Sequence, residues 1–303
     1  MTLSDNGEIY VIAGPTGSGK SQTALDLAQA INGEIISADS MQLYKGLDIG
    51  TAKVTREEQA LVKHYLIDVY DMTVKSDVFK FVEMAREAIA IIRSRGKTPI
   101  IAGGTGFYIK SLLYGLDNLP GDDKLRAEIE LEFAGDEGFS ELKKLMAEID
   151  PEILEKYQNY HRKLIRALEV YRLTGEKFSK LQSEENNKLL YPNVKSFWIE
   201  HERDVLKSRI RQRAEIMLAA GWIEEADELI KQGLLQTPSA WQALGYSLID
   251  RYLKNEFDYA ELTEKIATAT WQFARRQLTW FRHQHPESIR IEKADYREIL
   301  ERK

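Results

Sequence analysis

The chain has 303 residues and a net charge of −6, and its proportions of 43% apolar, 30% charged and 10% aromatic residues are ordinary for a folded enzyme. This composition excludes disordered, collagen-like and disulfide-stapled proteins. The chain has no cysteine, which excludes a thiolate nucleophile and a cysteine-bound zinc and fits a reducing compartment. Its length suffices for about two domains, or for one α/β domain with a large insertion.

No apolar run reaches the roughly 20 residues that a membrane-spanning helix requires. The longest runs, such as 8–13 and 98–102, are the size of strands. Residues 1–7 carry neither the basic nor the apolar region of a signal peptide. We therefore expect a cytoplasmic protein that does not associate with a membrane.

The predicted secondary structure alternates between strands and helices. Strands are predicted at 8–13, 34–37, 98–102 and 195–199, and helices at 21–31 and 79–95. Such alternation favours a parallel sheet covered by helices on both faces. After the last of these strands, the remainder of the chain is predicted to be helical.

A purely helical pattern interrupts the alternation from about residue 116 to 182. It is entered through the turn at 119–122 and left through the polar stretch 183–188. We therefore predict an α/β core from residues 1–115 and 190–303, with a helical C-terminal part, and an inserted helical subdomain from residues 116–189.

Charge is unevenly distributed along the chain. The segment from Asp122 to Glu155 holds twelve acids and four bases, which gives 4 − 12 = −8. Three clusters are basic: Arg162, Lys163, Arg166, Arg172 and Lys177; Arg203, Lys207, Arg209, Arg211 and Arg213; and Arg275, Arg276, Arg282 and Arg290. By charge alone these clusters are either solvated helix faces or contacts to a polyanion, because binding depends on the local field.

A phosphate-binding motif lies between the first predicted strand and the first predicted helix. The eight residues fit the pattern of a P-loop: Gly14, Pro15, Thr16, Gly17, Ser18, Gly19, Lys20 and Ser21. In a P-loop, backbone N–H groups surround a phosphate, the lysine neutralises it, and the serine hydroxyl binds Mg²⁺. We therefore predict a P-loop NTPase-like α/β fold that binds a di- or triphosphate.

Two further motifs follow predicted strands. The segment 37–42, which contains Asp39, comes after the second strand, and the segment 103–106, which contains Thr105, comes after the third. Neighbouring parallel strands end at the same edge of a sheet, so Asp39 is expected near the P-loop. Its carboxylate suits Mg²⁺ binding or the acceptance of a proton, and a turn or helix cap is the alternative.

These motifs together resemble the tRNA dimethylallyltransferase family. The resemblance covers nearly the whole chain, through the P-loop, residues 36–53, 64–68, 103–108, 166–171, 202–203 with Arg209 and Arg213, 242–246 and 276–282. The family transfers a dimethylallyl group from dimethylallyl diphosphate to N6 of adenosine 37, beside the anticodon. Its substrates are tRNAs that read codons beginning with U.

The resemblance implies a role for each matching residue. The implied catalytic residues are Asp39, Thr105, Lys20 and Arg209. The residues implied to contact the tRNA anticodon stem-loop are Asp39, Ser40, Met41, Gln42, Thr105, Arg126, Arg162, Lys163, Arg166, Gln242, Gly245, Tyr246, Arg275, Arg276, Gln277 and Arg282. The implied cofactor is Mg²⁺ at Ser21, and a monomer is expected.

The implied reaction needs a base and a stabilised leaving group. Asp39 is implied to accept the N6 proton, because an exocyclic adenine amine is a poor nucleophile. Lys20, the P-loop amides, Arg209 and Mg²⁺ on Ser21 are implied to stabilise the diphosphate, while Thr105 positions the reactants.

The family also binds its RNA with basic helices and flips the target adenine out of the stack. Aromatic residues among the basic clusters are implied to offer stacking surfaces, namely Trp241, Tyr246, Trp271, Trp280 and Phe281. We expect the acidic segment to face solvent, away from the RNA phosphates. Single aromatic residues such as Trp271 can instead belong to the core.

The chain departs from the family pattern in one turn. Residues 157–161 read Tyr-Gln-Asn-Tyr-His where the family usually has a His-Pro-Asn-Asp-like turn, so an RNA contact there is in doubt. The chain also lacks the Cys/His zinc finger that eukaryotic members append, and a compact bacterial-type enzyme is expected.

Two other functions remain open at this point. A P-loop small-molecule kinase that uses ATP fits the P-loop equally well, but it has no use for a helical insertion and an aromatic, basic C-terminal third. A non-catalytic RNA-binding module is disfavoured because Lys20 and Asp39 are both present.

Overall fold

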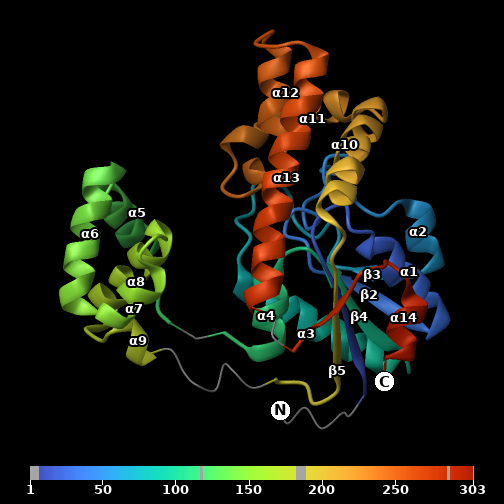
Figure 1. Ribbon diagram of the computed structural model, residues 1–303, viewed down its shortest axis with the longest axis horizontal. Helices are drawn as coiled ribbons and strands as arrows, with labels where there is room; N and C mark the ends of the chain where they lie inside the picture. The colour runs from blue at the N-terminus through green and yellow to red at the C-terminus, as the bar shows by residue number, and fades with distance from the viewer. Residues whose placement is uncertain (1–6, 117–118, 182–188, 285–286, 303) are drawn as a thin grey trace. The chain divides into compact units, whose positions relative to one another are not determined.

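Figure 1 shows the computed structural model, which describes residues 7–116, 119–181, 189–284 and 287–302. Contacts divide the chain into two units. The first, the core unit, comprises residues 1–113 and 190–303, and the second, the helical unit, comprises residues 114–189. Each unit has its own apolar core.

A parallel sheet forms the centre of the core unit, which confirms the predicted α/β fold. Its strands are β1 Ile9–Ala13, β2 Gly33–Ser37, β3 His64–Tyr65, β4 Thr98–Gly103, β5 Val194–Ile199 and β6 Ile289–Ile291. They pair in the order β3-β2-β4-β1-β5-β6, with every described pair parallel. Because the strands run in one direction, β1, β2 and β4 bring the residues that follow them to one edge of the sheet.

Two strands are absent from the sequence-based prediction. β3 has two residues and β6 has three, and two of the three in β6 are exposed. The prediction that the chain after 199 is wholly helical is therefore wrong. A strand this short and this exposed carries no alternating or continuous apolar pattern, so periodicity cannot reveal it.

Helices cover both faces of the sheet. Helix α1 Lys20–Ala30 and helix α14 Tyr296–Glu301 contact each other and share an apolar cluster with β1, β2, β4 and β5. Alternate side chains on the same strands, such as Val11 and Ile101, are buried as well, as in a sheet covered on both sides. Helix α3 Val78–Ser94 contacts β2 and β4.

Helices after β5 build a second core within the core unit. They are α10 Arg203–Ala219, α11 Trp222–Lys231, α12 Tyr246–Leu253 and α13 Tyr259–Gln284, with 3-10 turns at Leu234–Gln236 and Ala240–Gln242. Trp222 and Tyr246 are its largest fully buried side chains, and Tyr44 from the loop after β2 joins them. Figure 1 shows α13 running from α12 down to the sheet beside α4 Gly106–Tyr114.

The helical unit contains α5 Asp123–Glu132, α6 Gly135–Ile149, α7 Pro151–Tyr157, α8 His161–Thr174 and α9 Phe178–Leu181. Ile129, Leu142, Met146 and Leu164 pack in its core. Among the residues that the structure describes, no helix is long and apolar enough to cross a membrane.

Candidate active site

The P-loop follows β1 directly and ends in the first turn of α1. Gly17 has φ +80° and Gly19, which precedes α1, has φ +90°, a conformation that favours glycine. A Cβ on Gly19 would lie 2.9 Å from the Cβ of Ala294. The glycines of the motif are therefore required by the path of the backbone.

Two side chains from the part of the chain that follows β5 hydrogen-bond to the backbone of the P-loop. Arg209 Nε donates to the carbonyl of Gly17 over 2.8 Å, and His201 Nε2 donates to the carbonyl of Ser18 over 2.8 Å. The hydroxyl of Ser18 is buried and has no hydrogen-bond partner among the described residues. A buried hydroxyl without a partner costs free energy, which a bound phosphate oxygen would remove.

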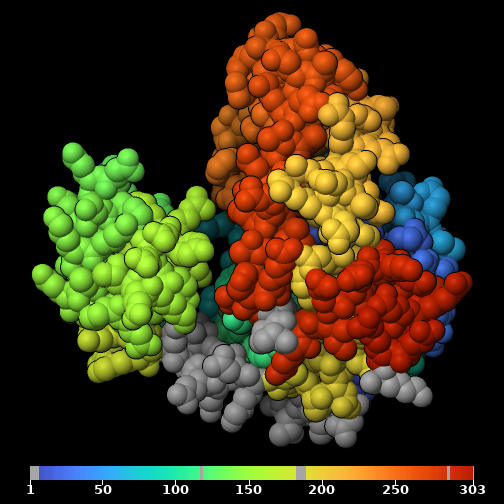
Figure 2. Space-filling model, viewed as in Figure 1, coloured from blue at the N-terminus to red at the C-terminus, as the bar shows by residue number. Residues whose placement is uncertain are grey.

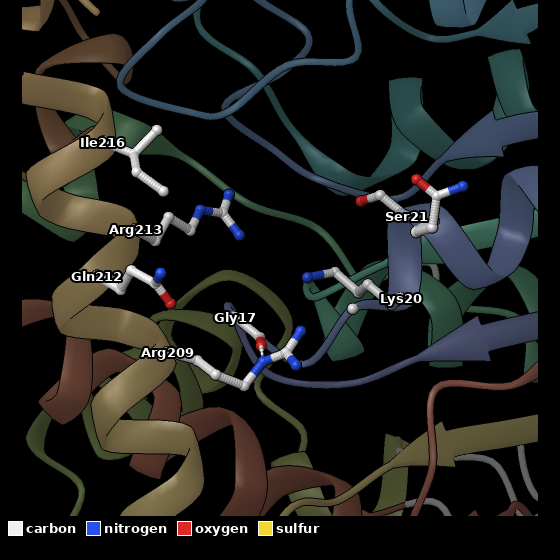
Figure 3. Close-up of a pocket in the computed structure, with 9 residues that line it drawn as sticks. Gly17, Lys20, Ser21, Arg209, Gln212, Arg213 and Ile216 are labelled. Carbon is white, nitrogen blue, oxygen red and sulfur yellow. Dashed lines mark hydrogen bonds between the residues drawn. The ribbon is translucent and has the colours of Figure 1, made fainter. Parts of the chain in front are cut away.

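A cavity of about 330 Å³ opens between the P-loop and α10. Figure 3 shows Arg209, Arg213 and other side chains of α10 pointing toward Lys20 and Ser21 at the start of α1. The residues that line it are Gly17, Gly19, Lys20, Ser21, Gln22, Arg209, Gln212, Arg213 and Ile216. The cavity therefore joins the predicted phosphate site to one of the three basic clusters.

The cations of this cavity repel one another. Burial and the nearby charge of Arg213 lower the pKa of Lys20 to about 8, and the attraction of Asp39 offsets this only in part. Burial also lowers the pKa of Arg213, with repulsion from Arg209 adding to it and Asp39 again opposing it. Several buried positive charges placed close together are unfavourable unless an anion binds, so this arrangement is typical of a site whose ligand is an anion.

Asp39 and Thr105 lie together at the carboxyl ends of β2 and β4. The N–H of Ser40 donates to Thr105 Oγ1 over 3.1 Å, and the N–H of Thr105 donates to the carbonyl of Ala38 over 3.1 Å. One Asp39 oxygen accepts the N–H of Met41 over 3.0 Å, in an Asx turn. The half-buried Asp39 carboxylate thus stands in a fixed turn and interacts electrostatically with Lys20 and Arg213.

The segment after Asp39 is held by the C-terminal helices. Glu225 accepts hydrogen bonds from the N–H groups of Asp48, Ile49 and Gly50 over 3.1, 2.7 and 3.0 Å, and from the hydroxyl of Tyr246 over 2.7 Å. The ring of Tyr246 is fully buried, and burial together with Glu225 raises the pKa of its hydroxyl. The prediction that Tyr246 offers a stacking surface to RNA is therefore wrong, because its ring packs on Trp222.

Gln277 and Phe281 of α13 are likewise internal. Phe281 is 1% exposed and stacks on Trp198 of β5, so it offers no surface to a base. Gln277 is 7% exposed and hydrogen-bonds to Thr16 and Gly104. Both belong to the α13 motif of the sequence, but neither points to solvent: Phe281 packs on the sheet, and Gln277 bonds to the loops that follow β1 and β4.

Other residues predicted to contact RNA are on the surface of the core unit. Gln242, Arg275 and Arg276 are exposed, and Arg276 lies over the ring of Phe273. Arg282 is exposed but donates to Glu200 over 2.9 Å. Figure 2 shows α10 and α13 side by side on this surface. Of the predicted stacking residues, Trp241 is exposed, while Trp271 carries the cations of Arg203 and Lys207 over its ring.

In the helical unit, two predicted RNA-binding arginines share an internal partner. Arg126 donates to the fully buried carboxylate of Glu169 over 2.9 Å, and Arg166 pairs with the same carboxylate at 2.8 Å. Arg166 also donates to the carbonyls of Leu119 and Pro120. Burial raises the pKa of Glu169, but these hydrogen bonds outweigh it and hold the pKa below its usual value. Their geometry shows a stabilising role, and an RNA contact remains a prediction.

The rest of the predicted surface of the helical unit divides in a similar way. Arg162 and Lys163 are exposed, and so is Tyr160 in the turn that departs from the family pattern, at 62%. The acidic segment was expected to face solvent, but it does not do so throughout. Asp150 is 1% exposed and caps α7, and Glu132 forms an ion pair with Arg172.

The residues around Ser21 fit a metal ion that takes few of its ligands from the protein and most of them from a bound phosphate and from water. Ser21 is exposed at the first turn of α1, and its hydroxyl points into the cavity (Figure 3). Among the described residues no group of three or more acidic, histidine or cysteine side chains could hold a metal ion. Mg²⁺ commonly binds in this manner, through one or two protein oxygens, phosphate oxygens and water.

Arg213 is a member of the site that the sequence-based prediction did not include. It lines the same cavity as Arg209, which was predicted to bind the diphosphate, whereas Arg213 was placed only in a basic cluster. Residues four apart share one face of a helix, so the spacing of Arg209 and Arg213 carried the signal. The fold, the P-loop, the three cations and the neighbouring carboxylate are those of an α/β enzyme whose site suits a phosphorylated substrate.

Comparisons with known proteins identify the family. The sequence model of the IPP transferase family matches residues 42–284. The tRNA dimethylallyltransferase 1 of Trichlorobacter lovleyi is 42% identical over 90% of both chains, and the tRNA dimethylallyltransferase of Bacillus mycoides is 41% identical over 91% of this chain and 87% of its own. The chain belongs to the IPP transferase family and is a prenyltransferase enzyme.

Solved structures agree with this assignment. The full-length tRNA isopentenylpyrophosphate transferase of Bacillus halodurans has a TM-score of 0.69 and 34% identity, over 97% of this chain and 93% of its own. A eukaryotic dimethylallyltransferase acting on tRNA has a TM-score of 0.76 and 30% identity, over 91% of this chain and 70% of its own.

Proposed function

We propose that this enzyme transfers a dimethylallyl group from dimethylallyl diphosphate to N6 of adenosine 37 in tRNAs that read codons beginning with U. The observation that carries the proposal is one cavity in which Lys20, Arg209 and Arg213 meet beside Asp39. The cations suit the diphosphate, and the carboxylate suits the amine. The names of the similar proteins support both substrates.

The donor half of the reaction develops negative charge. As the allylic C1–O bond breaks, its electrons leave with the diphosphate, which gains one further negative charge, and the three cations stabilise it. The Ser18 hydroxyl and the P-loop N–H groups add uncharged donors. Mg²⁺, held by Ser21 and by diphosphate oxygens, would supply further positive charge there.

The acceptor half of the reaction needs a proton acceptor. N6 of adenine forms a bond to C1 while Asp39 takes the N6 proton, and diphosphate leaves with the electrons of the C1–O bond. Thr105, whose hydroxyl accepts the N–H of Ser40, holds the Asp39 turn and lies beside the reactants. The target base must leave its stack to reach this site, which costs a few kcal/mol.

Surface cations of both units supply the RNA contacts in this proposal. Arg275 and Arg276 on α13, and Arg162 and Lys163 on α8, are exposed cations of the predicted set, and Arg282, which pairs with Glu200, is exposed as well. Phosphate contacts of this kind position an RNA without reading its sequence. We expect the protein to act as a monomer in the cytoplasm.

The test combines one assay with two variants. The enzyme is incubated with radiolabelled dimethylallyl diphosphate and unmodified tRNA, and in parallel with labelled ATP and a panel of small acceptors. Asp39→Ala should lower turnover by about 10²-fold or more with little change in tRNA affinity. Lys20→Ala should abolish productive donor binding.

The exposed Asp71 provides a matched control for Asp39. It is paired only with exposed Lys45 among the contacts described, so Asp71→Ala should leave turnover unchanged. Label transferred from ATP to a small acceptor, with none from the prenyl donor to tRNA, would establish the kinase instead. Equal losses of tRNA binding and turnover in Asp39→Ala would make Asp39 a recognition residue.

A further inference from the structure

Gln277 of α13 connects two loops that lie far from it in the sequence. Its Oε1 accepts the N–H of Thr16 in the P-loop over 2.9 Å, and its Nε2 donates to the carbonyl of Gly104 over 2.9 Å. The side chain is 7% exposed, so both hydrogen bonds are shielded from water. A buried amide with both ends satisfied holds a fixed orientation.

The first of these hydrogen bonds acts on Lys20. The N–H of Thr16 and the carbonyl of Pro15 belong to one planar peptide, so they point in opposite directions. The carbonyl of Pro15 accepts from Lys20 Nζ over 3.4 Å and from the N–H of Ser18 over 3.2 Å. By fixing the N–H, Gln277 fixes the direction of the carbonyl that holds the lysine.

The second hydrogen bond acts on the turn that carries Asp39. Gly104 immediately precedes Thr105, whose N–H and hydroxyl bind the backbone of Ala38 and Ser40. A Cβ on Gly104 would lie 2.4 Å from Gln277 Nε2, so the residue at 104 must be a glycine for the amide to approach. One side chain therefore spans the donor half and the acceptor half of the site.

We propose that Gln277 is a positioning residue, which fixes the P-loop lysine and the Asp39–Thr105 turn relative to each other without touching either substrate. This inference rests on the proposed function, in which the two halves hold two reactants. It replaces the sequence-based prediction that Gln277 contacts tRNA. Misplacing a reacting group by about 1 Å can cost on the order of 10²-fold in rate.

The test compares two identical substitutions on one helix. Gln277→Met removes both hydrogen bonds at nearly constant volume, while Gln272→Met changes an exposed glutamine of α13. We expect Gln277→Met to lower kcat by about 10-fold to 10²-fold and to weaken binding of dimethylallyl diphosphate, measured by calorimetry. Affinity for an anticodon stem-loop should change less than about twofold, and Gln272→Met should match the wild type.

A second variant separates positioning from mere packing. Gln277→Glu can donate to Gly104 only while its carboxyl group is protonated. Its kcat relative to the wild type should therefore recover as the pH is lowered, whereas that of Gln277→Met should stay constant. A structural role alone predicts no such recovery.

Two results would overturn the inference. One is a Gln277→Met enzyme with normal kcat and donor affinity. The other is a loss confined to stem-loop binding, which would restore the RNA contact. Donor binding by calorimetry needs no tRNA, so a failure of the proposed acceptor substrate leaves that arm of the experiment intact and is recognised separately.

Discussion

Arginines gather in both units of the chain, but their surroundings differ. In the core unit, Arg209 and Arg213 share a cavity with Lys20. Burial lowers the pKa of Arg213, and repulsion from Arg209 adds to it. In the helical unit, Arg126 and Arg166 converge on the buried carboxylate of Glu169, and this pairing raises the pKa of Arg126.

The difference distinguishes arginines whose charge is available to an anionic ligand from arginines whose charge a carboxylate of the protein already neutralises. A cluster with excess positive charge is destabilising until an anion binds, whereas a matched buried pair stabilises the fold. Arg209 and Arg213 lie in one basic cluster of the sequence and Arg166 lies in another, so clustering alone does not distinguish the two kinds. Only the position of a carboxylate partner tells them apart, and in α8 that partner is three residues away from Arg166.

The largest effect expected is on the unneutralised cluster. Arg213→Ala should weaken dimethylallyl diphosphate binding and lower kcat/KM by about 10²-fold, because a charge-assisted contact to the leaving group is lost. Steady-state kinetics at saturating tRNA measures this. Arg251→Ala, which removes an exposed arginine paired with Glu256, is the control and should leave kcat/KM unchanged. An unchanged kcat/KM in Arg213→Ala would remove this residue from the donor site.

The neutralised pair should affect stability instead. Glu169→Gln should lower the free energy of unfolding of the helical unit by about 2–3 kcal/mol. This is less than for a fully buried pair, because the side chains of Arg126 and Arg166 are 35% and 28% exposed. Hydrogen exchange of α5 and α8 amides measures the loss, and exposed Glu155→Gln is the control. Equal protection in both variants would contradict the structural role.

The pH dependence of donor binding should report the lowered pKa of Lys20, which burial and the charge of Arg213 cause. The Lys20 pKa near 8 means that the ammonium is lost as the pH rises through about 8, whereas an ordinary lysine keeps it to about 10.4. Affinity for dimethylallyl diphosphate should therefore fall above pH 8, approaching tenfold per pH unit. In Lys20→Arg the fall should disappear, because a guanidinium stays charged. The same decline in both proteins would assign the titration to another group.

The smallest effect distinguishes surface arginines from internal ones. Arg276→Ala should flatten the slope of log K against log salt for an anticodon stem-loop by about one unit, since it removes one phosphate contact. Arg166→Ala should leave the slope unchanged, because its donors are used by Glu169 and two carbonyls. A flattened slope in Arg166→Ala would restore the RNA contact that the sequence predicted.

The positions of strands β1, β2, β4 and β5 and of the P-loop follow from local sequence. An apolar strand, a glycine-rich turn and an amphipathic helix are adjacent in the chain, so periodicity and motif locate them. Asp39 could be placed near the P-loop because parallel strands end at one edge. The short strand β6 could not be predicted, since it depends on pairing with β5 about 90 residues earlier.

The burial of Tyr246 and of Gln277 also could not be predicted from the sequence. Each lies in a motif with exposed polar neighbours, and its direction depends on the rotation of a helix against distant loops. Tyr246 is oriented by its hydrogen bond to Glu225, which in turn binds the backbone of residues 48–50. Gln277 is oriented by its hydrogen bonds to Thr16 and Gly104. Long-range hydrogen bonds of this kind leave no periodic signal.

The two ends of the inserted segment meet within the core unit. The N–H of Leu190, which follows the segment, donates to the carbonyl of Leu113, which precedes it, over 2.8 Å. The core unit is therefore connected across the point of insertion, and the inserted segment has the topology of a unit that can be replaced as a whole. Under the proposed function, substitutions in the insertion would change RNA binding separately from group transfer.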